Sequence, residues 1–96
     1  MQMREEELHE RALKIVNARG LHARAAAKLV KTAERFDAEI TVCHDGQTVS
    51  ANSVMDLLLL TAPKGSTIVV QASGPQAEAA LDAITELVAN RFGEDE

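Results

Sequence analysis

The sequence predicts one small α+β domain, an open-faced two-layer sandwich in which a four-stranded antiparallel sheet is covered on one face by three helices. The 96 residues suffice for one domain with a modest core. Short segments with a two-residue apolar period alternate with longer segments that have the helical period. No repeat, low-complexity tract or linker interrupts them, so the predicted element order is β-α-β-β-α-β-α.

The first strand and the first helix follow from two apolar patterns. Residues 11–18 place Leu13 and Ile15 on one side of a strand, with Lys14 and Val16 on the other. Gly20 ends this pattern. Residues 23–36 form an amphipathic helix with basic side chains between its apolar positions. These apolar positions are Ala26, Leu29, Val30, Ala33 and Phe36.

A hairpin, a short helix and a central strand are expected next. Residues 39–44 and 47–51 are joined by Asp45-Gly46, one of the best signals for a tight hairpin turn. Asn52 or Ser53 can cap a helix over residues 54–60. After a turn at residues 63–65, the β-branched run at 67–72 indicates a central strand.

The last helix is expected to open at residues 73–75, where Pro75 suits a first turn, and to end near Gly93. Both chain ends look unpacked. We therefore predict a flexible acidic leader over residues 1–9, a domain over 10–92 and an acidic tail over 93–96. The apolar face of this helix comprises Ala77, Ala80, Leu81, Ile84, Leu87 and Val88.

Charge is distributed unevenly along the chain. The net charge is -5, yet residues 11–36 contain seven basic residues and only one acidic residue, Glu34. Such a segment favours anions or acidic partners, although a basic, solvated helix face would look the same. The acidic total and the absence of Trp and Tyr argue against nucleic-acid binding. The longest apolar candidate for a membrane span, residues 54–62, contains Asp56 and Thr61.

Cys43 is the only cysteine, and no apolar run resembling a signal peptide is present at the N-terminus. Both observations favour a reducing, cytoplasmic setting. Cys43 and His44 are adjacent in a predicted strand and point to opposite faces, which argues against a Cys-His catalytic pair. His9 and His44 have no setting for chemistry, and the histidine spacing does not match a zinc site.

His22 is the strongest candidate for chemistry. It follows the flexible Gly20 and precedes a helix whose first amides lack intrahelical partners, an arrangement that stabilises an anion. An uncharged imidazole nitrogen is nucleophilic near neutral pH, and Arg24 offers a fork of donors to phosphoryl oxygens. A locally hydrogen-bonded histidine without function is the alternative. The combination of motif, basic helix and element order favours the phosphoryl site.

Residues 13–88 resemble the histidine-containing phosphocarrier protein HPr of the bacterial phosphoenolpyruvate-dependent phosphotransferase system, or its nitrogen-branch relative. The active-site signature of that family, Gly-Leu-His-x-Arg, is present as Gly20-Leu21-His22-Ala23-Arg24. The resemblance implies an HPr-like fold and a stoichiometric carrier rather than an enzyme. It also implies that enzyme I phosphorylates His22 at Nδ1, with magnesium belonging to enzyme I, and that an enzyme IIA-type acceptor takes the phosphoryl group.

Ser53 matches a second family position, at which HPr kinase/phosphorylase acts on many members. A phosphate there would suit a helix start and would change the charge of the docking surface, whereas a plain helix cap is the alternative. Val54, Met55 and Leu58 would supply the apolar part of that surface, unless they belong to the core. The residues assigned to partner binding are Leu21, Lys28, Lys31, Val54, Met55 and Leu58.

The chain departs from the family at three positions. Ala25 replaces the usual proline after the active-site arginine and restores a backbone amide. Asp56 stands where many relatives carry a basic or small residue, and Arg19 stands where a small polar residue is frequent. The Ala25 change favours regulation over bulk sugar transport, although the sequence does not specify a sugar or a nitrogen branch.

Three classes of function remain open at this stage. The first is a phosphocarrier; the second is a regulatory binding module whose contacts with target enzymes depend on its phosphorylation state. Replacing His22 would abolish the first and could spare the second. The third, a small-molecule sensor, lacks a pocket-forming polar or aromatic cluster in the sequence. No metal or organic cofactor is indicated on the protein, and a monomer is the simplest form for a carrier that docks through one face.

Overall fold

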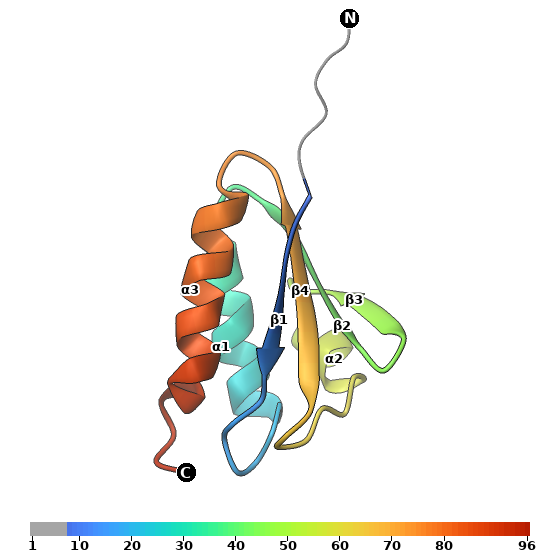
Figure 1. The fold of residues 1–96 in the computed structure, drawn as a ribbon, viewed down its shortest axis with the longest axis vertical. Coiled ribbons are helices and arrows are strands. Elements are labelled where there is room, and N and C mark those ends of the chain that lie inside the picture. The colour runs from blue at the N-terminus through green and yellow to red at the C-terminus, as the bar shows by residue number, and fades with distance from the viewer. Residues whose placement is uncertain (1–7) are drawn as a thin grey trace, which may run out of the picture.

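The computed structural model describes residues 8–96. Its strands and helices follow the predicted order, and a 3₁₀ turn, η1, is added after the last helix. Their bounds are β1 His9–Lys14, α1 Ala23–Glu34, β2 Glu39–His44, β3 Gln47–Ser50, α2 Val54–Leu58, β4 Thr67–Ser73, α3 Ala77–Ala89 and η1 Arg91–Gly93. Figure 1 shows these elements arranged as a sheet backed by helices.

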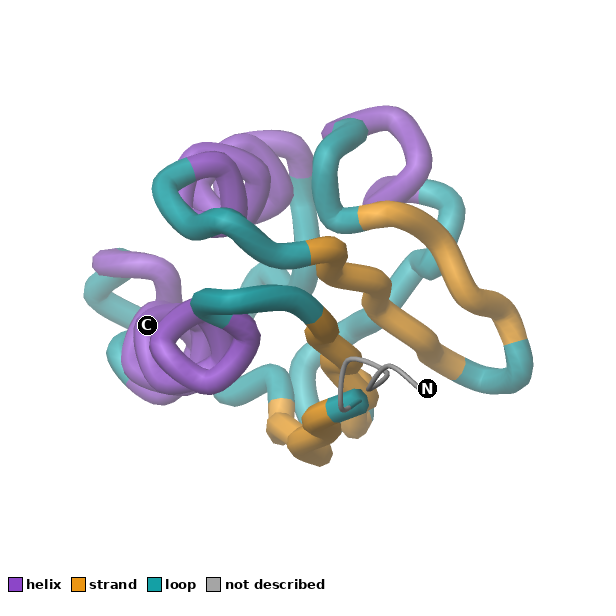
Figure 2. Tube along the Cα trace, turned by 90° about the horizontal axis from the view of Figure 1, so that it is seen from above, coloured by secondary structure: helices purple, strands orange, loops and turns teal. Residues whose placement is uncertain are grey.

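The four strands form one sheet in the order β1-β4-β2-β3, and every neighbouring pair is antiparallel. The three helices lie on the same face of this sheet, as the view along the strands shows (Figure 2). The predicted fold is therefore confirmed. Within residues 8–96, no helix is both long enough and apolar enough to cross a membrane.

The core lies between the sheet and the helices because each strand turns alternate side chains toward them. In β4, Ile68, Val70 and Ala72 are buried, while the residues between them are more exposed. Leu13 and Ile15 are buried, whereas Lys14 and Val16 are exposed, as the alternation predicted. The apolar faces of α1 and α3 cover these strand residues.

Several element boundaries differ from the sequence prediction: α1, β3 and α2 end at Glu34, Ser50 and Leu58, one or two residues earlier than predicted, and the larger differences are in β1 and α3. Strand β1 begins at His9, which pairs with Ala72 of the central strand, and ends at Lys14 rather than near residue 18. Helix α3 begins at Ala77, so Pro75 lies before it. Gln76 has non-helical angles (φ -115°, ψ 29°), and both its amide and its side chain bond with the backbone of Asp37. This loop contact sets the start of the helix.

The acidic tail is packed, so the prediction of an unpacked end at residues 93–96 is wrong. Arg91, Phe92 and Gly93 all have positive φ values (57°, 54° and 80°), which turn the chain back after α3. Phe92 is fully buried, and the Ala18 amide donates to the Glu96 carbonyl at 2.9 Å. The C-terminus therefore lies at the same end of the molecule as the start of α1 (Figure 1).

The predicted flexible leader falls only partly within the structure. Residues 1–7 lie outside the described part of the chain. His9, which the prediction placed in the leader, is the first residue of β1. The ordered domain therefore begins at least one residue earlier than predicted.

Candidate functional site

His22 is the N-cap residue of α1 and holds an extended backbone (φ -92°, ψ -178°). Its carbonyl accepts the Ala26 amide at 2.8 Å, which begins the helix, but its side chain makes no capping hydrogen bond. No hydrogen bond is recorded for the backbone amides of residues 23–25 with any described residue. Three consecutive amides are thus left open at the positive end of a twelve-residue helix.

Gly20 makes the tight turn that delivers His22 to this position. It has φ +69°, and a Cβ atom there would lie 2.6 Å from the carbonyl oxygen of Ala62. The Leu21 amide donates to that same oxygen at 2.9 Å. Only glycine allows so close an approach of two backbone segments. The motif glycine is therefore required by packing as well as by backbone conformation.

The buried side chain of Asn17 stabilises the same turn through a hydrogen bond. It is fully buried, and its Nδ2 group donates to the Gly20 carbonyl at 2.8 Å and to Oε1 of Glu94 at 3.0 Å. Its Oδ1 atom has no partner among the described residues. Because both bonds require an amide nitrogen, the orientation of the side chain is fixed even though one acceptor stays unpaired.

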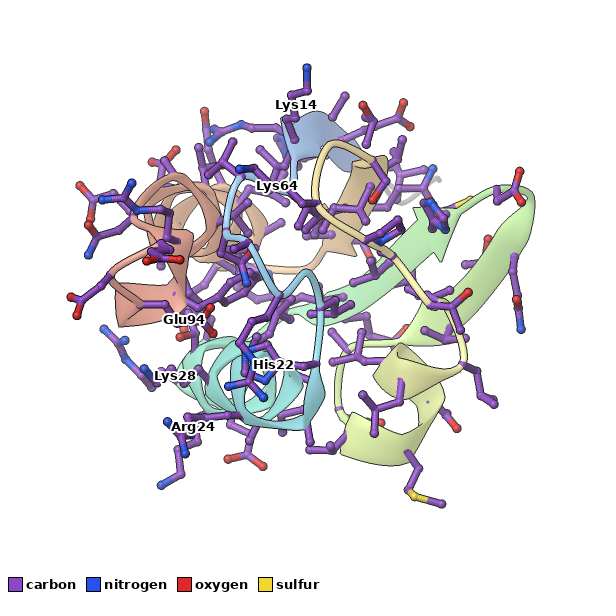
Figure 3. The ribbon with its side chains drawn as sticks, turned by 90° about the horizontal axis from the view of Figure 1, so that it is seen from below. Lys14, His22, Arg24, Lys28, Lys64 and Glu94 are labelled. Atoms are coloured by element: carbon purple, nitrogen blue, oxygen red, sulfur yellow. The ribbon has the colours of Figure 1, made fainter. Side chains whose placement is uncertain are left out.

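The Nε2 atom of His22 is hydrogen-bonded to Oε2 of Glu94. Each of the two side chains is only 15% exposed, so the bond is largely shielded from water. The other ring nitrogen, Nδ1, has no hydrogen bond recorded with any residue from 8 to 96. Figure 3 shows His22, Arg24, Lys28 and Glu94 gathered at this end of the molecule.

Glu94 is ionised at neutral pH. Burial raises the pKa of its carboxyl group, but hydrogen bonds from His22 and Asn17, together with electrostatic attraction toward the His22 ring and Arg19, outweigh burial and lower the pKa overall. An ionised carboxylate can only accept hydrogen bonds. Nε2 of His22 must therefore carry the proton in their shared bond.

Basic residues surround this pair. An open hollow of about 360 Å³ is lined by Arg19, Arg24 and Lys28 on one side and by the C-terminal tail on the other. Arg24 is exposed in the first turn of α1, and no hydrogen bond or ion pair is recorded for it within the described chain. Lys28 donates instead to the Phe92 carbonyl at 2.6 Å. Lys28 is therefore engaged by the tail, whereas Arg24 is available to an incoming anion.

The structure separates the remaining predicted site residues. Ser53 caps α2, and its hydroxyl oxygen accepts the Asp56 amide at 3.2 Å. Val54 and Leu58 are partly buried against the core, whereas Met55 is 75% exposed. Lys31 is exposed on α1. Leu21 is only 5% exposed and packs in the core, so its assignment to a partner-binding surface is wrong.

Sequence reasoning missed two residues of the site. Asn17 continues the buried face of Leu13 and Ile15, and a polar residue at a predicted core position was a signal that could have been used. Glu94 carried no local signal, because it lies 72 residues from His22 along the chain. Leu59, which is 60% exposed beside Met55, was also missed as part of an apolar surface.

Other candidate chemistry receives no support. His44 bonds through Nδ1 to the Leu60 carbonyl at 3.0 Å, and Cys43 is a half-buried free thiol. Among residues 8–96, no three His, Cys, Asp or Glu side chains are grouped so that they could hold a metal ion. The site at the start of α1 is therefore the best-formed reactive arrangement in the described chain.

The fold and this site define a class: small α+β proteins that present one histidine nitrogen beside an arginine at a helix N-terminus. The family model described as "PTS HPr component phosphorylation site" matches residues 9–90. The chain therefore belongs to the HPr family of phosphocarrier proteins.

Individual relatives agree with this assignment. The chain is 42% identical to phosphocarrier protein HPr of Cupriavidus necator over 87 residues, which cover 91% of this chain and 98% of that protein. It is 49% identical to phosphocarrier protein NPr of Shewanella violacea over 85 residues, covering 88% and 93%. The HPr-C-His structure from Thermoanaerobacter tengcongensis matches with a TM-score of 0.87 and 36% identity, covering 92% and 99%.

Proposed function

We propose that this protein accepts a phosphoryl group on Nδ1 of His22 from enzyme I and passes it to an enzyme IIA-type acceptor. The carrying observation is that Nε2 is engaged by Glu94 while Nδ1 has no recorded partner within residues 8–96. The protein would act as a stoichiometric carrier that is modified and released, rather than as an enzyme. A cytoplasmic location and a monomeric state fit this role.

The transfer needs a nitrogen lone pair on His22. That lone pair on Nδ1 attacks phosphorus, and the bond between phosphorus and the donor atom breaks, leaving its electron pair on the donor. The His22 ring keeps its Nε2 proton and becomes positively charged. No proton has to move during this step, and the reverse sequence returns a neutral ring when the acceptor takes the phosphoryl group.

The start of α1 is suited to hold the transferred group. The open amides of residues 23–25 and the positive end of the helix favour the phosphoryl oxygens. Ala25 contributes one amide that the usual proline would lack. Arg24 can turn toward the oxygens, because no described residue is recorded as bonded to it. Positioning and charge neutralisation of this kind do most of the work in phosphoryl transfer.

Partner proteins would dock on the basic and apolar surface beside His22. We define this docking surface as Arg24, Lys31, Val54, Met55, Leu58 and Leu59. Its exposed methionine and leucine supply apolar area, and its cations favour acidic partners. Lys28 contributes less than expected, because its ammonium group is used by the Phe92 carbonyl. Enzyme I and the IIA-type acceptor would use this surface in turn.

Regulation is the second candidate output, and the exposed apolar residues of α2 favour it. Met55 lies in the helix that Ser53 caps and Leu59 directly follows that helix, so a phosphate on Ser53 would change the charge near them. HPr kinase/phosphorylase would be the modifying partner, and regulatory target enzymes would read the result. Asp56 in the first turn opposes a second negative charge there. Incubation with this kinase and ATP, read by intact mass against Ser53→Ala, tests the modification.

The central experiment is phosphotransfer from phosphoenolpyruvate through enzyme I and magnesium, followed by intact mass. We expect one acid-labile phosphoryl addition on the wild type and none on His22→Ala. A wild type left unmodified by competent enzyme I from both the sugar and nitrogen branches would refute the carrier function. Equal modification of the two proteins would refute His22 as its site.

A further inference from the structure

We infer that Glu94 is a positioning residue for this transfer: its carboxylate holds the His22 proton on Nε2 and so keeps the reactive lone pair on Nδ1. This inference rests on the proposed function, because it assigns a role within that reaction. The bond between Nε2 and Glu94 is its first support. A histidine whose tautomer is set by a carboxylate does not have to reorganise before it reacts.

The contact is held in place by the surrounding structure. Phe92, two residues before Glu94, is fully buried, and the ammonium group of Lys28 in α1 donates a hydrogen bond to the Phe92 carbonyl. Asn17 donates to the second carboxylate oxygen of Glu94, so both oxygens of that group are used. Two residues after Glu94, the Glu96 carbonyl accepts the Ala18 amide. The tail is thus anchored before, at and after the residue that meets His22.

Asn17 joins the two parts of the site. Its single Nδ2 group bonds both to the Gly20 carbonyl in the turn before His22 and to Glu94 in the tail. One buried side chain therefore sets the position of the histidine and of the carboxylate together. This orientation is kept although Oδ1 of Asn17, a buried acceptor, finds no hydrogen-bond partner within residues 8–96.

The carboxylate also faces the charge that appears during transfer. When Nδ1 bonds to phosphorus, the ring becomes positive and Nε2 remains protonated. Glu94 lies on the Nε2 side, where it stabilises that charge without contacting the phosphoryl oxygens. Arg24 and the open amides act on the phosphoryl group from the start of α1. The positive charge on the His22 ring is therefore stabilised by the Glu94 carboxylate, and the negative charge of the phosphoryl group by Arg24 and the open amides.

The test compares Glu94→Ala, Glu94→Gln and Asp95→Ala in the full chain. Asp95→Ala removes the same charge from the next tail residue and serves as the matched control. The rate of phosphoryl transfer from enzyme I is one readout. The second is nuclear magnetic resonance of the His22 ring in the unphosphorylated protein, where we expect a hydrogen-bonded, exchange-protected proton on Nε2.

We expect Glu94→Ala to lose the protected Nε2 proton and to accept phosphoryl groups roughly tenfold more slowly, the effect of one lost charge-assisted hydrogen bond. Glu94→Gln keeps an acceptor oxygen without the charge, so it should retain the protected proton and transfer at an intermediate rate. Asp95→Ala should keep the proton and slow transfer less than Glu94→Ala does.

Two results would overturn the inference. One is a wild-type ring spectrum or transfer rate in Glu94→Ala, and the other is an equal loss of rate in Asp95→Ala. Failure of the proposed function is a different result, in which the wild type itself takes no phosphoryl group. The ring spectra of the unmodified proteins would still test the tautomer in that case.

Discussion

The N-termini of α1 and α2 begin in the same way but are used differently. Both cap residues are extended, with φ -92° at His22 and φ -135° at Ser53. Ser53 accepts an amide of its own helix, whereas the His22 side chain makes no capping bond and turns to Glu94 instead. A helix start closed by its own cap contributes stability, while one left open can bind an anion.

The sharpest test of this difference is to remove each cap side chain. We expect His22→Ala to abolish phosphorylation, because no other residue offers a ring nitrogen at the start of α1. Ser53→Ala should still be phosphorylated on His22 but should unfold about 1 kcal/mol more easily, the usual effect of losing a cap. Intact mass and urea unfolding measure the two effects. Loss of His22 phosphorylation in Ser53→Ala would contradict the separate roles of the two helix starts.

The turn before α1 should tolerate substitution of its glycine far less than the hairpin turn at Asp45-Gly46 does. Gly20→Ala combines a left-handed backbone with a clash against the Ala62 carbonyl, so we expect a loss of about 3 kcal/mol or more and an altered site. Gly46→Ala is the matched control, because Gly46 also has positive φ (83°) but meets nothing within 4 Å. It should lose only about 1 kcal/mol. Equal losses in thermal or urea unfolding would contradict the packing role of Gly20.

A third prediction concerns the contribution of Arg24 to phosphoryl transfer at the start of α1. Removing its guanidinium leaves the amides of α1 as the main donors to the phosphoryl group. Arg24→Ala should therefore slow transfer from enzyme I by about ten- to a hundredfold, the range expected for lost charge-assisted bonds. Arg35→Ala removes the same charge at the other end of α1, where that arginine lies over the Phe36 ring. Its transfer rate should stay within about twofold of wild type, and an equal loss would show that only overall charge matters.

The smallest effect concerns stability against pH. The pKa of Glu94 is lowered in the folded protein, so its contribution to stability is fully present above the ordinary glutamate pKa. That contribution disappears as pH falls through the lowered value, because both the folded and unfolded states are then protonated. We expect the free energy of unfolding of the wild type to exceed that of Glu94→Ala by less than about 1 kcal/mol at pH 7. Urea unfolding at pH 7 and pH 2 should show the difference vanish in acid; an undiminished difference would contradict a stabilising role of the ionised Glu94 carboxylate.

Local sequence was sufficient for most of the fold. The Asp45-Gly46 turn predicted the hairpin because both residues adopt positive φ (52° and 83°), which these residue types tolerate. The alternation around Leu13 and Ile15 predicted the buried side of the first strand region, and Ser53 was predicted as one of two possible caps of α2. Such features depend on neighbours within a few residues, so a sequence pattern carries them.

The sequence by itself determined the element order, the apolar faces and the histidine at the start of a basic helix. Tertiary structure alone decided that Leu21 is buried, that Lys28 holds the tail and that Glu94 meets His22. The reason is physical. The Glu94 contact joins residues 72 apart and depends on three consecutive positive-φ residues, on burial of Phe92 and on the orientation of Asn17. None of these conditions leaves a periodic pattern in the sequence, and together they bring the acidic tail to His22.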